Sequence, residues 1–194
     1  AVLAALKEAS LKHVDETGWK INGASRWLWS VANKAWAYTR IANSRGSKIP
    51  KELLGHPFKG VMVSDFFSAY NKMYGLHQKC LVHLRRDIHH ARGEDPPLDF
   101  SGPDKQLKRL LADADRLAER RDVYSRAVFS QRVRRLKARL FHFATAVYSH
   151  KDWQRLSARL LKHKDQIFTS LDVPGVPADN NHAERAKGKR DVFN

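Results

Sequence analysis

The spacing of apolar residues changes once along this chain, and that change constrains the fold more than any other feature. From residue 10 to about residue 92, apolar and polar residues alternate, as in the run AWAYTRIA, which is typical of half-buried β-strands. Residues 93–103, GEDPPLDFSGP, form a break rich in Pro, Gly and Asp. After the break, apolar residues recur at helical spacing. The pattern therefore predicts a part built on a sheet, followed by a helical part.

The first part predicts a mixed α/β sheet. Three strand-like runs come first, namely SLKHVDE, RWLWSVA and AWAYTRIA. The Asn33-Lys34 step predicts a hairpin between the second and third runs. The run SKIPKELLG has the start of a helix and a stop at Gly55, and the buried run GVMV and a short strand over QKCLVHL follow. This order of three strands, helix, strand, helix and strand indicates an α/β fold.

The second part predicts three amphipathic helices separated by loops near 121–125 and 148–151. Their apolar positions are Leu107, Leu110, Leu111, Ala114 and Leu117, then Phe129, Val133, Leu136, Leu140, Phe143 and Val147, then Trp153, Leu156, Leu160 and Leu161. The polar faces are strongly basic, most of all in RVRRLKAR at 132–139. A solvated helix face explains this run as well as a DNA-contacting face does.

Charge narrows the class of partner. Lys and Arg number 36 against 20 Asp and Glu, which gives a formal charge of +16. This excess favours binding of a polyanion such as nucleic acid over a role in solubility alone.

The apolar content of 42% suffices for a real core. The single cysteine, Cys80, cannot form an internal disulfide, and no window is apolar enough to span a membrane. We therefore expect a cytoplasmic protein that does not bind membranes.

Two carboxylates follow apolar runs at candidate strand ends. Asp15 ends the first strand pattern, and Asp65 follows the apolar run Val61, Met62 and Val63. Functional groups gather at the carboxyl ends of strands in α/β sheets. Two neighbouring carboxylates repel each other unless a cation lies between them, and Mg²⁺ or Mn²⁺ prefers oxygen ligands. Each aspartate taken alone also fits a turn-forming cap. A third acidic residue, Glu184, would lie in a helix that Asp179 or Asn180 begins.

Four blocks of the sequence resemble the insertion sequence 66 family of bacterial transposases. They are VDETGWKINGASRWLWS, GVMVSDFFSAY, QKCLVHLRRDI and ADNNHAERA. The resemblance implies a ribonuclease H-like mixed sheet flanked by helices, with an all-helical insertion before the last acidic residue. It implies that Asp15, Asp65 and Glu184 are the catalytic residues and the ligands of Mg²⁺ or Mn²⁺. The catalytic core would then comprise residues 1–100 and 173–194, with a truncated or diverged C-terminus, and residues 101–172 would be the insertion.

Basic residues are the candidate DNA contacts. The resemblance places His83 near the active site, and the neighbouring arginines are plausible phosphate ligands. The predicted substrate-binding residues are His83, Arg85, Arg86, Arg132, Arg134, Arg135 and Arg139. Cys80 and His83 also allow a zinc site completed by His89 and His90, but their spacing matches no strong zinc pattern.

The resemblance predicts a DDE-type transposase that cuts and joins DNA by metal-dependent phosphoryl transfer. Its partners would be the transposon ends and the target DNA, with a homo-oligomer on DNA and accessory transposition proteins as further partners. Two alternatives share the sequence features. One is a DNA-binding remnant without catalysis, and the other is a structure-specific nuclease of the same fold.

Overall fold

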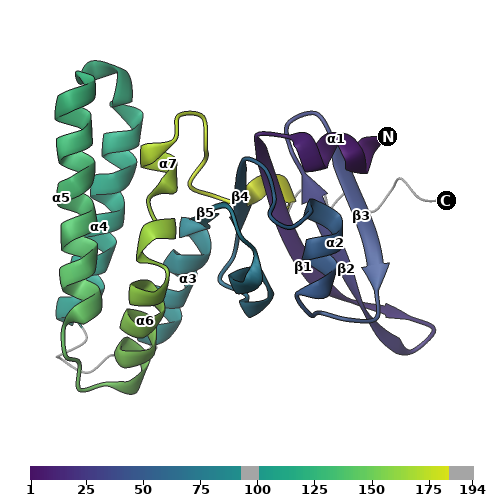
Figure 1. The fold of residues 1–194 in the computed structure, drawn as a ribbon. Helices are drawn as coiled ribbons and strands as arrows, with labels where there is room; N and C mark the ends of the chain where they lie inside the picture. The colour runs from purple at the N-terminus through teal and green to yellow at the C-terminus, as the bar shows by residue number, and fades with distance from the viewer. Residues whose placement is uncertain (93–100, 184–194) are drawn as a thin grey trace. The chain divides into compact units, whose positions relative to one another are not determined.

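A computed structural model describes residues 1–92 and 101–183 (Figure 1). The chain divides into two compact units. The first, which we call the sheet unit, contains residues 1–80 and the segment that begins at Asp179. The second, which we call the helical unit, contains residues 81–178. The sheet unit is therefore built from two segments that lie far apart in the sequence.

The sheet unit contains a five-stranded sheet in the order β3-β2-β1-β4-β5. Its strands are β1 (Leu11–Ile21), β2 (Ala24–Ala32), β3 (Ala37–Ala42), β4 (Val61–Ser64) and β5 (Leu76–Lys79). Strand β2 is antiparallel to both β1 and β3, whereas β4 is parallel to both β1 and β5. The sheet is mixed, which confirms the predicted α/β class.

Two tight turns join the antiparallel strands. Asn33 accepts hydrogen bonds at Oδ1 from the backbone N–H groups of Ala35 and Trp36, and this confirms the predicted hairpin between β2 and β3. Between β1 and β2, Asn22 and Gly23 both have positive φ, as a two-residue hairpin turn requires. The prediction that a strand ends at Asp15 is wrong, because this turn carries the antiparallel pairing of β1 on to Ile21.

One face of the sheet packs against short helices. Helix α1 (Val2–Glu8) and helix α2 (Lys48–Leu54) lie along this face (Figure 1). These helices and the 3₁₀ turn η1 (Ser68–Lys72) supply apolar side chains to it. The cluster includes Leu6, Val14, Trp29, Val31, Leu53, Met62 and Tyr70. Because side chains alternate along a strand, residues 14 and 16 of β1 face this core, and residues 13 and 15 face the opposite side.

The chain leaves the sheet earlier than the sequence pattern predicts. The predicted strand over QKCLVHL is wrong beyond Lys79, because helix α3 (Leu81–Arg92) begins two residues later. Its buried residues Leu81, Leu84 and Ile88 recur at helical spacing. The helical spacing of apolar residues continues over the twelve residues of α3, whereas the strand-like alternation covers only the first few of them, so the segment folds as a helix. Cys80 is the last residue of the sheet unit, and its N–H donates to the Ser64 carbonyl at 2.8 Å.

The helical unit consists of helices and turns, without a strand among its described residues. After α3 come α4 (Ser101–Glu119), α5 (Arg126–Thr145), α6 (Lys151–Lys162) and α7 (Thr169–Asp172), with 3₁₀ turns η3 (Arg121–Val123) and η4 (Lys164–Gln166). Helices α4 and α5 form a long antiparallel pair (Figure 1). The predicted apolar positions of α4, α5 and α6 are mostly buried, whereas Val147 and Leu161 are exposed.

A glycine allows β4 to lie against the start of β1. Gly60 has φ of +71°, and a Cβ at this position would lie 2.3 Å from the backbone oxygen of Ser10. The next residue, Val61, donates its N–H to that same oxygen at 2.8 Å. A larger residue would therefore push β4 away from β1 at the point where their pairing begins.

We predict that Gly60→Ala destabilises the protein by about 2 kcal/mol or more, because it combines an unfavourable positive φ with a backbone clash. The matched control is Gly18→Ala in β1, where a Cβ would meet nothing within 4 Å. Urea denaturation measures both variants. Equal stability of Gly60→Ala and Gly18→Ala would show that this close approach of the strands is not required.

Candidate active site

The register of β1 and β4 places Asp15 and Asp65 at equivalent positions. Leu11 pairs with Val61 and His13 pairs with Val63, so partners differ by 50 in residue number. Asp15 and Asp65 also differ by 50. The pairing ends at His13, and Asp65 is the first residue after β4. Since neighbouring strands lie about 4.8 Å apart, the two aspartates occupy corresponding places where β4 leaves the sheet.

The turn that carries Asp65 is held by its own hydrogen bonds. One carboxylate oxygen of Asp65 accepts from the Phe67 N–H at 2.9 Å, which is a common turn arrangement for aspartate. The Asp65 carbonyl accepts from the Lys79 ammonium group at 2.8 Å and from the Ser64 hydroxyl at 3.0 Å. Lys79 is fully buried. The backbone at Asp65 is therefore anchored to β5, while the side chain remains half-buried.

Asp15 lies among buried polar groups on the face of the sheet opposite the apolar core. It is 5% exposed and pairs across the sheet with Ser30 of β2. His13 lies on the same face, two residues earlier. The Ser30 hydroxyl and His13 Nε2 are both buried and have no hydrogen-bond partner among the described residues. Polar atoms that can bind a ligand or a water molecule thus flank Asp15.

The segment before Glu184 is attached to this same face. Asn180 donates from Nδ2 to the Val14 carbonyl at 2.8 Å, and its Oδ1 lies 3.2 Å from His13 Nδ1. Because the Val14 carbonyl can only accept, Oδ1 faces His13, and His13 carries its proton on Nδ1. Ala183 is fully buried. Glu184 itself lies outside the described residues, so its part in the site stays a prediction.

Burial keeps His13 neutral near pH 7. Loss of solvent is the largest cause that lowers the pKa of His13, and the charge of His182 lowers it further. The hydrogen bond with Asn180 and the charge of Asp179 oppose this shift, and the pKa is about 4. The rings of His13 and His182 lie 4.8 Å apart between centroids.

A buried glutamate that the sequence did not reveal lies directly after Asp15. Glu16 faces the apolar core, where its Oε2 accepts from the Tyr70 hydroxyl at 2.5 Å. Its Oε1 accepts from Arg45 at both Nε (3.1 Å) and Nη2 (2.7 Å). The Arg45 guanidinium lies over the rings of Trp27 and Phe67, at 4.5 and 3.9 Å from their centroids. In the sequence, the only feature that points to Glu16 is its place beside Asp15 in VDET. Its partners, Arg45 and Tyr70, are 29 and 54 residues away, so no local pattern reveals the contact.

The electrostatics of Glu16 link this core network to the two aspartates. Burial is the main cause that raises the pKa of the Glu16 carboxyl, and the charges of Asp65 and Asp15 raise it further. The hydrogen bonds from Tyr70 and Arg45 act in the opposite direction. Asp15 and Asp65 therefore both lie within electrostatic reach of one buried carboxylate, which is consistent with their shared position in the register.

The other predicted contacts lie in the helical unit. His83, Arg85 and Arg86 are on helix α3, where Arg85 forms an ion pair with Asp115 of α4 and Arg86 is exposed. The remaining predicted contacts, Arg132, Arg134, Arg135 and Arg139, are all on α5. Their binding of DNA stays a prediction.

The described residues do not by themselves form a metal site. Among residues 1–92 and 101–183, no group of three or more His, Cys, Asp or Glu side chains is arranged to hold a metal ion. This result gives no support to zinc at Cys80, which is fully buried in the sheet unit. It leaves the predicted Mg²⁺ or Mn²⁺ site open, because that site includes Glu184.

Sequence comparison identifies the chain as a DNA-processing protein of the transposase class. The model of the Transposase IS66 family matches residues 1–187, so the chain belongs to this family. No curated protein and no solved structure shows a significant match to the chain. No helix in the part of the chain that the structure describes is long and apolar enough to cross a membrane.

We predict that Tyr70→Phe lowers the unfolding free energy by about 1–3 kcal/mol, because it leaves Glu16 Oε2 buried without its donor. The control is Tyr74→Phe, since Tyr74 is 69% exposed. Urea denaturation compares the two variants with the parent protein. A Tyr70→Phe variant as stable as Tyr74→Phe would mean that the hydroxyl contributes nothing to the core.

We predict that His13 makes the metal-free protein less stable as the pH falls from 6.5 to 4. The unfolded histidine binds a proton near pH 6.5, whereas the folded one does so only near pH 4. Unfolding therefore takes up a proton in this window, and up to about 3 kcal/mol of stability is lost. Urea denaturation with EDTA at several pH values should give a shallower pH dependence for His13→Asn. Parallel curves would contradict the prediction.

Proposed function

We propose that this chain is the catalytic core of a DDE-type transposase, in which Asp15, Asp65 and Glu184 hold Mg²⁺ or Mn²⁺. The observation that carries the proposal is the matching register of Asp15 and Asp65 on neighbouring parallel strands. Burying one carboxylate beside another is unfavourable unless a cation is bound between them. Because the chain belongs to a transposase family, the reaction that such a metal site would serve is phosphoryl transfer on DNA. The mixed sheet with flanking helices is compatible with the ribonuclease H-like fold that the family resemblance implies.

The donor atoms of the site suit a hard divalent cation. Carboxylate oxygens are the ligands that Mg²⁺ and Mn²⁺ prefer, and such ions retain water in their coordination shell. The buried His13 Nε2 and Ser30 hydroxyl, on the face that carries Asp15, can accept hydrogen bonds from such water. When bound, the metal supplies charge stabilisation for an in-line phosphoryl transfer.

The chain's own residues keep the site in place. Lys79 and the Phe67 N–H hold the turn at Asp65, and Asn180 attaches the segment that precedes Glu184 to β1. Glu16, one residue after Asp15, ties β1 to Tyr70 in the turn that follows Asp65. Positioning of this kind is what phosphoryl transfer without a covalent intermediate demands of a protein.

The proposed substrate is DNA. Transposases act on transposon ends and on target DNA, and the formal charge of +16 favours a polyanionic partner. Assembly as a homo-oligomer on DNA, accessory transposition proteins and a cytoplasmic location belong to the same proposal. Strand cleavage followed by strand joining distinguishes it from the nuclease alternative, which would cleave only.

We predict that Asp65→Asn separates catalysis from folding. The asparagine Oδ1 can still accept from the Phe67 N–H, so the turn is retained, and removal of one charge relieves repulsion. The metal-free variant should therefore be at least as stable as the parent protein. Its rise in Tm with Mg²⁺ or Mn²⁺ and its DNA cleavage should be lost, while duplex binding is retained. Thermal melts, a nicking assay and fluorescence anisotropy measure these properties.

The control is Asp165→Asn in the helical unit, where the side chain is 83% exposed. It should keep the metal response and the cleavage of the parent protein. If Asp65→Asn unfolds the chain, or keeps the full response to Mn²⁺, then Asp65 is a structural cap. If the parent protein binds DNA but shows neither metal response nor cleavage, the chain is a DNA-binding remnant.

A further inference from the structure

A groove lined by arginines lies between α4 and α5 in the helical unit. Its volume is about 290 Å³. The cationic residues that line it are Arg116, Arg120, Arg132, Arg135 and Arg139. Leu117 and Leu136 are the apolar residues of its lining, and Asp113 is the acidic one. We call this feature the arginine groove.

Helical geometry explains why these arginines face one another. Arg116 lies in the last turn of α4, and Arg120 directly follows the end of that helix at Glu119, so both line the same end of the groove. On α5, residues 132, 135 and 139 fall within an arc of about 60° at about 100° per residue. Arg134 lies about 200° around the helix from Arg132, and it lines a different pocket together with Lys137. The basic run of α5 therefore presents two separate surfaces.

The arginine groove carries excess positive charge. Its lining contains five arginines and one carboxylate, that of Asp113, which leaves an excess of four positive charges. Asp113 pairs with Arg116 and with Arg139, the latter at 2.7 Å. Partial burial raises the pKa of Asp113, but the hydrogen bonds from these two arginines outweigh it and leave the pKa below its usual value. Arg120 and Arg135 have no carboxylate partner among the described residues.

The two helices also hold the groove in shape. The Arg132 guanidinium lies 4.4 Å from the centroid of the Tyr124 ring, in the connection between α4 and α5. The ion pair of Asp113 with Arg139 joins α4 to α5. Such contacts restrict the arginine side chains before a ligand binds, which lowers the entropy that binding costs.

We propose that the arginine groove binds the phosphodiester backbone of duplex DNA. Guanidinium groups bind phosphate oxygens through two parallel hydrogen bonds, and all five cations of the groove are arginines. Arg132 and Arg139, the ends of the α5 stripe, are seven positions apart, or about 10 Å along the helix, which corresponds to about three base-pair steps of 3.4 Å. The identity of the ligand as DNA rests on the proposed function, whereas the groove itself does not.

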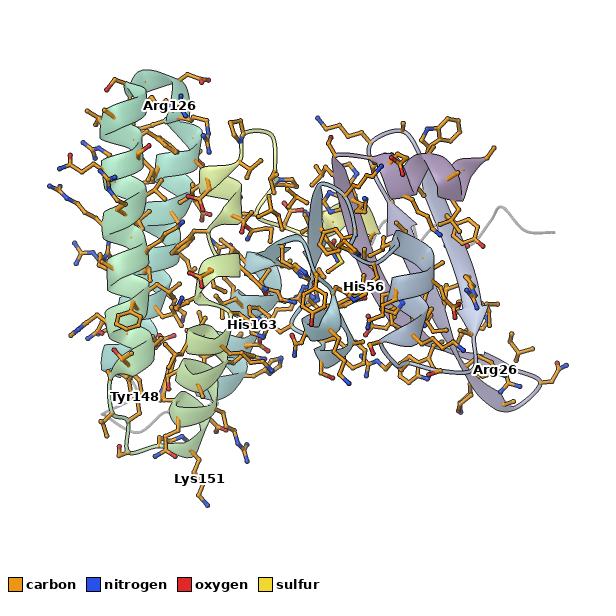
Figure 2. All side chains as sticks on the ribbon, in the orientation of Figure 1. Arg26, His56, Arg126, Tyr148, Lys151 and His163 are labelled. Atoms are coloured by element: carbon orange, nitrogen blue, oxygen red, sulfur yellow. The ribbon has the colours of Figure 1, made fainter. Side chains whose placement is uncertain are left out.

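The test compares two double variants of the full chain that remove equal charge. Arg120→Ala with Arg135→Ala should weaken duplex binding and reduce the magnitude of the log–log salt slope by about 1.8, since each lost phosphate contact contributes about 0.9. The control, Arg126→Ala with Lys151→Ala, removes two exposed cations that do not line the arginine groove and are not among the predicted DNA contacts, and Figure 2 labels both residues. It should leave the slope near the parent value. Fluorescence anisotropy over a range of salt concentrations measures both, and circular dichroism checks the fold.

Further arms of the experiment separate the possible outcomes. Arg120→Lys with Arg135→Lys should keep the salt slope but lower the affinity, because lysine retains the charge and loses the two-point contact. Equal loss in both alanine variants, or none in the groove variant, would overturn the proposal. Competition by polyglutamate as strong as that by unlabelled duplex would instead indicate an acidic protein partner. A groove variant that fails to bind DNA yet keeps its metal-induced rise in Tm leaves the proposed active site untouched.

Discussion

The pairing of β1 with two neighbours of opposite direction is the constraint on which the sheet unit depends. Its antiparallel partner β2 follows it to the hairpin at Ile21, whereas its parallel partner β4 stays beside it only as far as His13. Asp15 therefore lies inside a strand that is held on one side, at the place where the other side opens. Strand β4 ends at Ser64, and Asp65 is the first residue after it, so β4 does not pair with β1 beyond His13.

Buried charges reinforce the same geometry. The ammonium group of Lys12 donates to the carbonyls of Lys7 and Lys59, at 2.9 and 2.7 Å, and burial lowers the pKa of Lys12. Lys79 holds the turn at Asp65, and Glu16 is paired with Arg45. A buried charge is costly when its partner is lost, so each of these contacts favours one arrangement of strands and turns over its alternatives. The polar core thus specifies the geometry around the two aspartates.

The helical unit shows how charge is divided by secondary structure. Basic residues that are consecutive in the sequence do not form one surface patch when they lie in an α-helix, because the helix points successive side chains in different directions around its axis. On α5, Lys137 pairs with Asp172 of α7, whereas Arg139 pairs with Asp113 of α4. Some cations therefore stabilise the packing of the helices, and others remain available to a ligand. Net charge alone cannot make this distinction.

Local structure could be predicted from the amino-acid sequence, because the spacing of apolar residues and the choice of turn residues act over a few neighbouring positions. The Asn33 hairpin, the α/β class and helices α4, α5 and α6 all follow from such patterns. The Asn22-Gly23 turn, and with it the true length of β1, could also have been predicted from its dipeptide. Three features emerge only in the folded structure: the register of β1 and β4, the contacts of Glu16 with Arg45 and Tyr70, and the groove that arginines of α4 and α5 line together. These features join residues that lie between 12 and 54 positions apart, and no local pattern encodes such contacts.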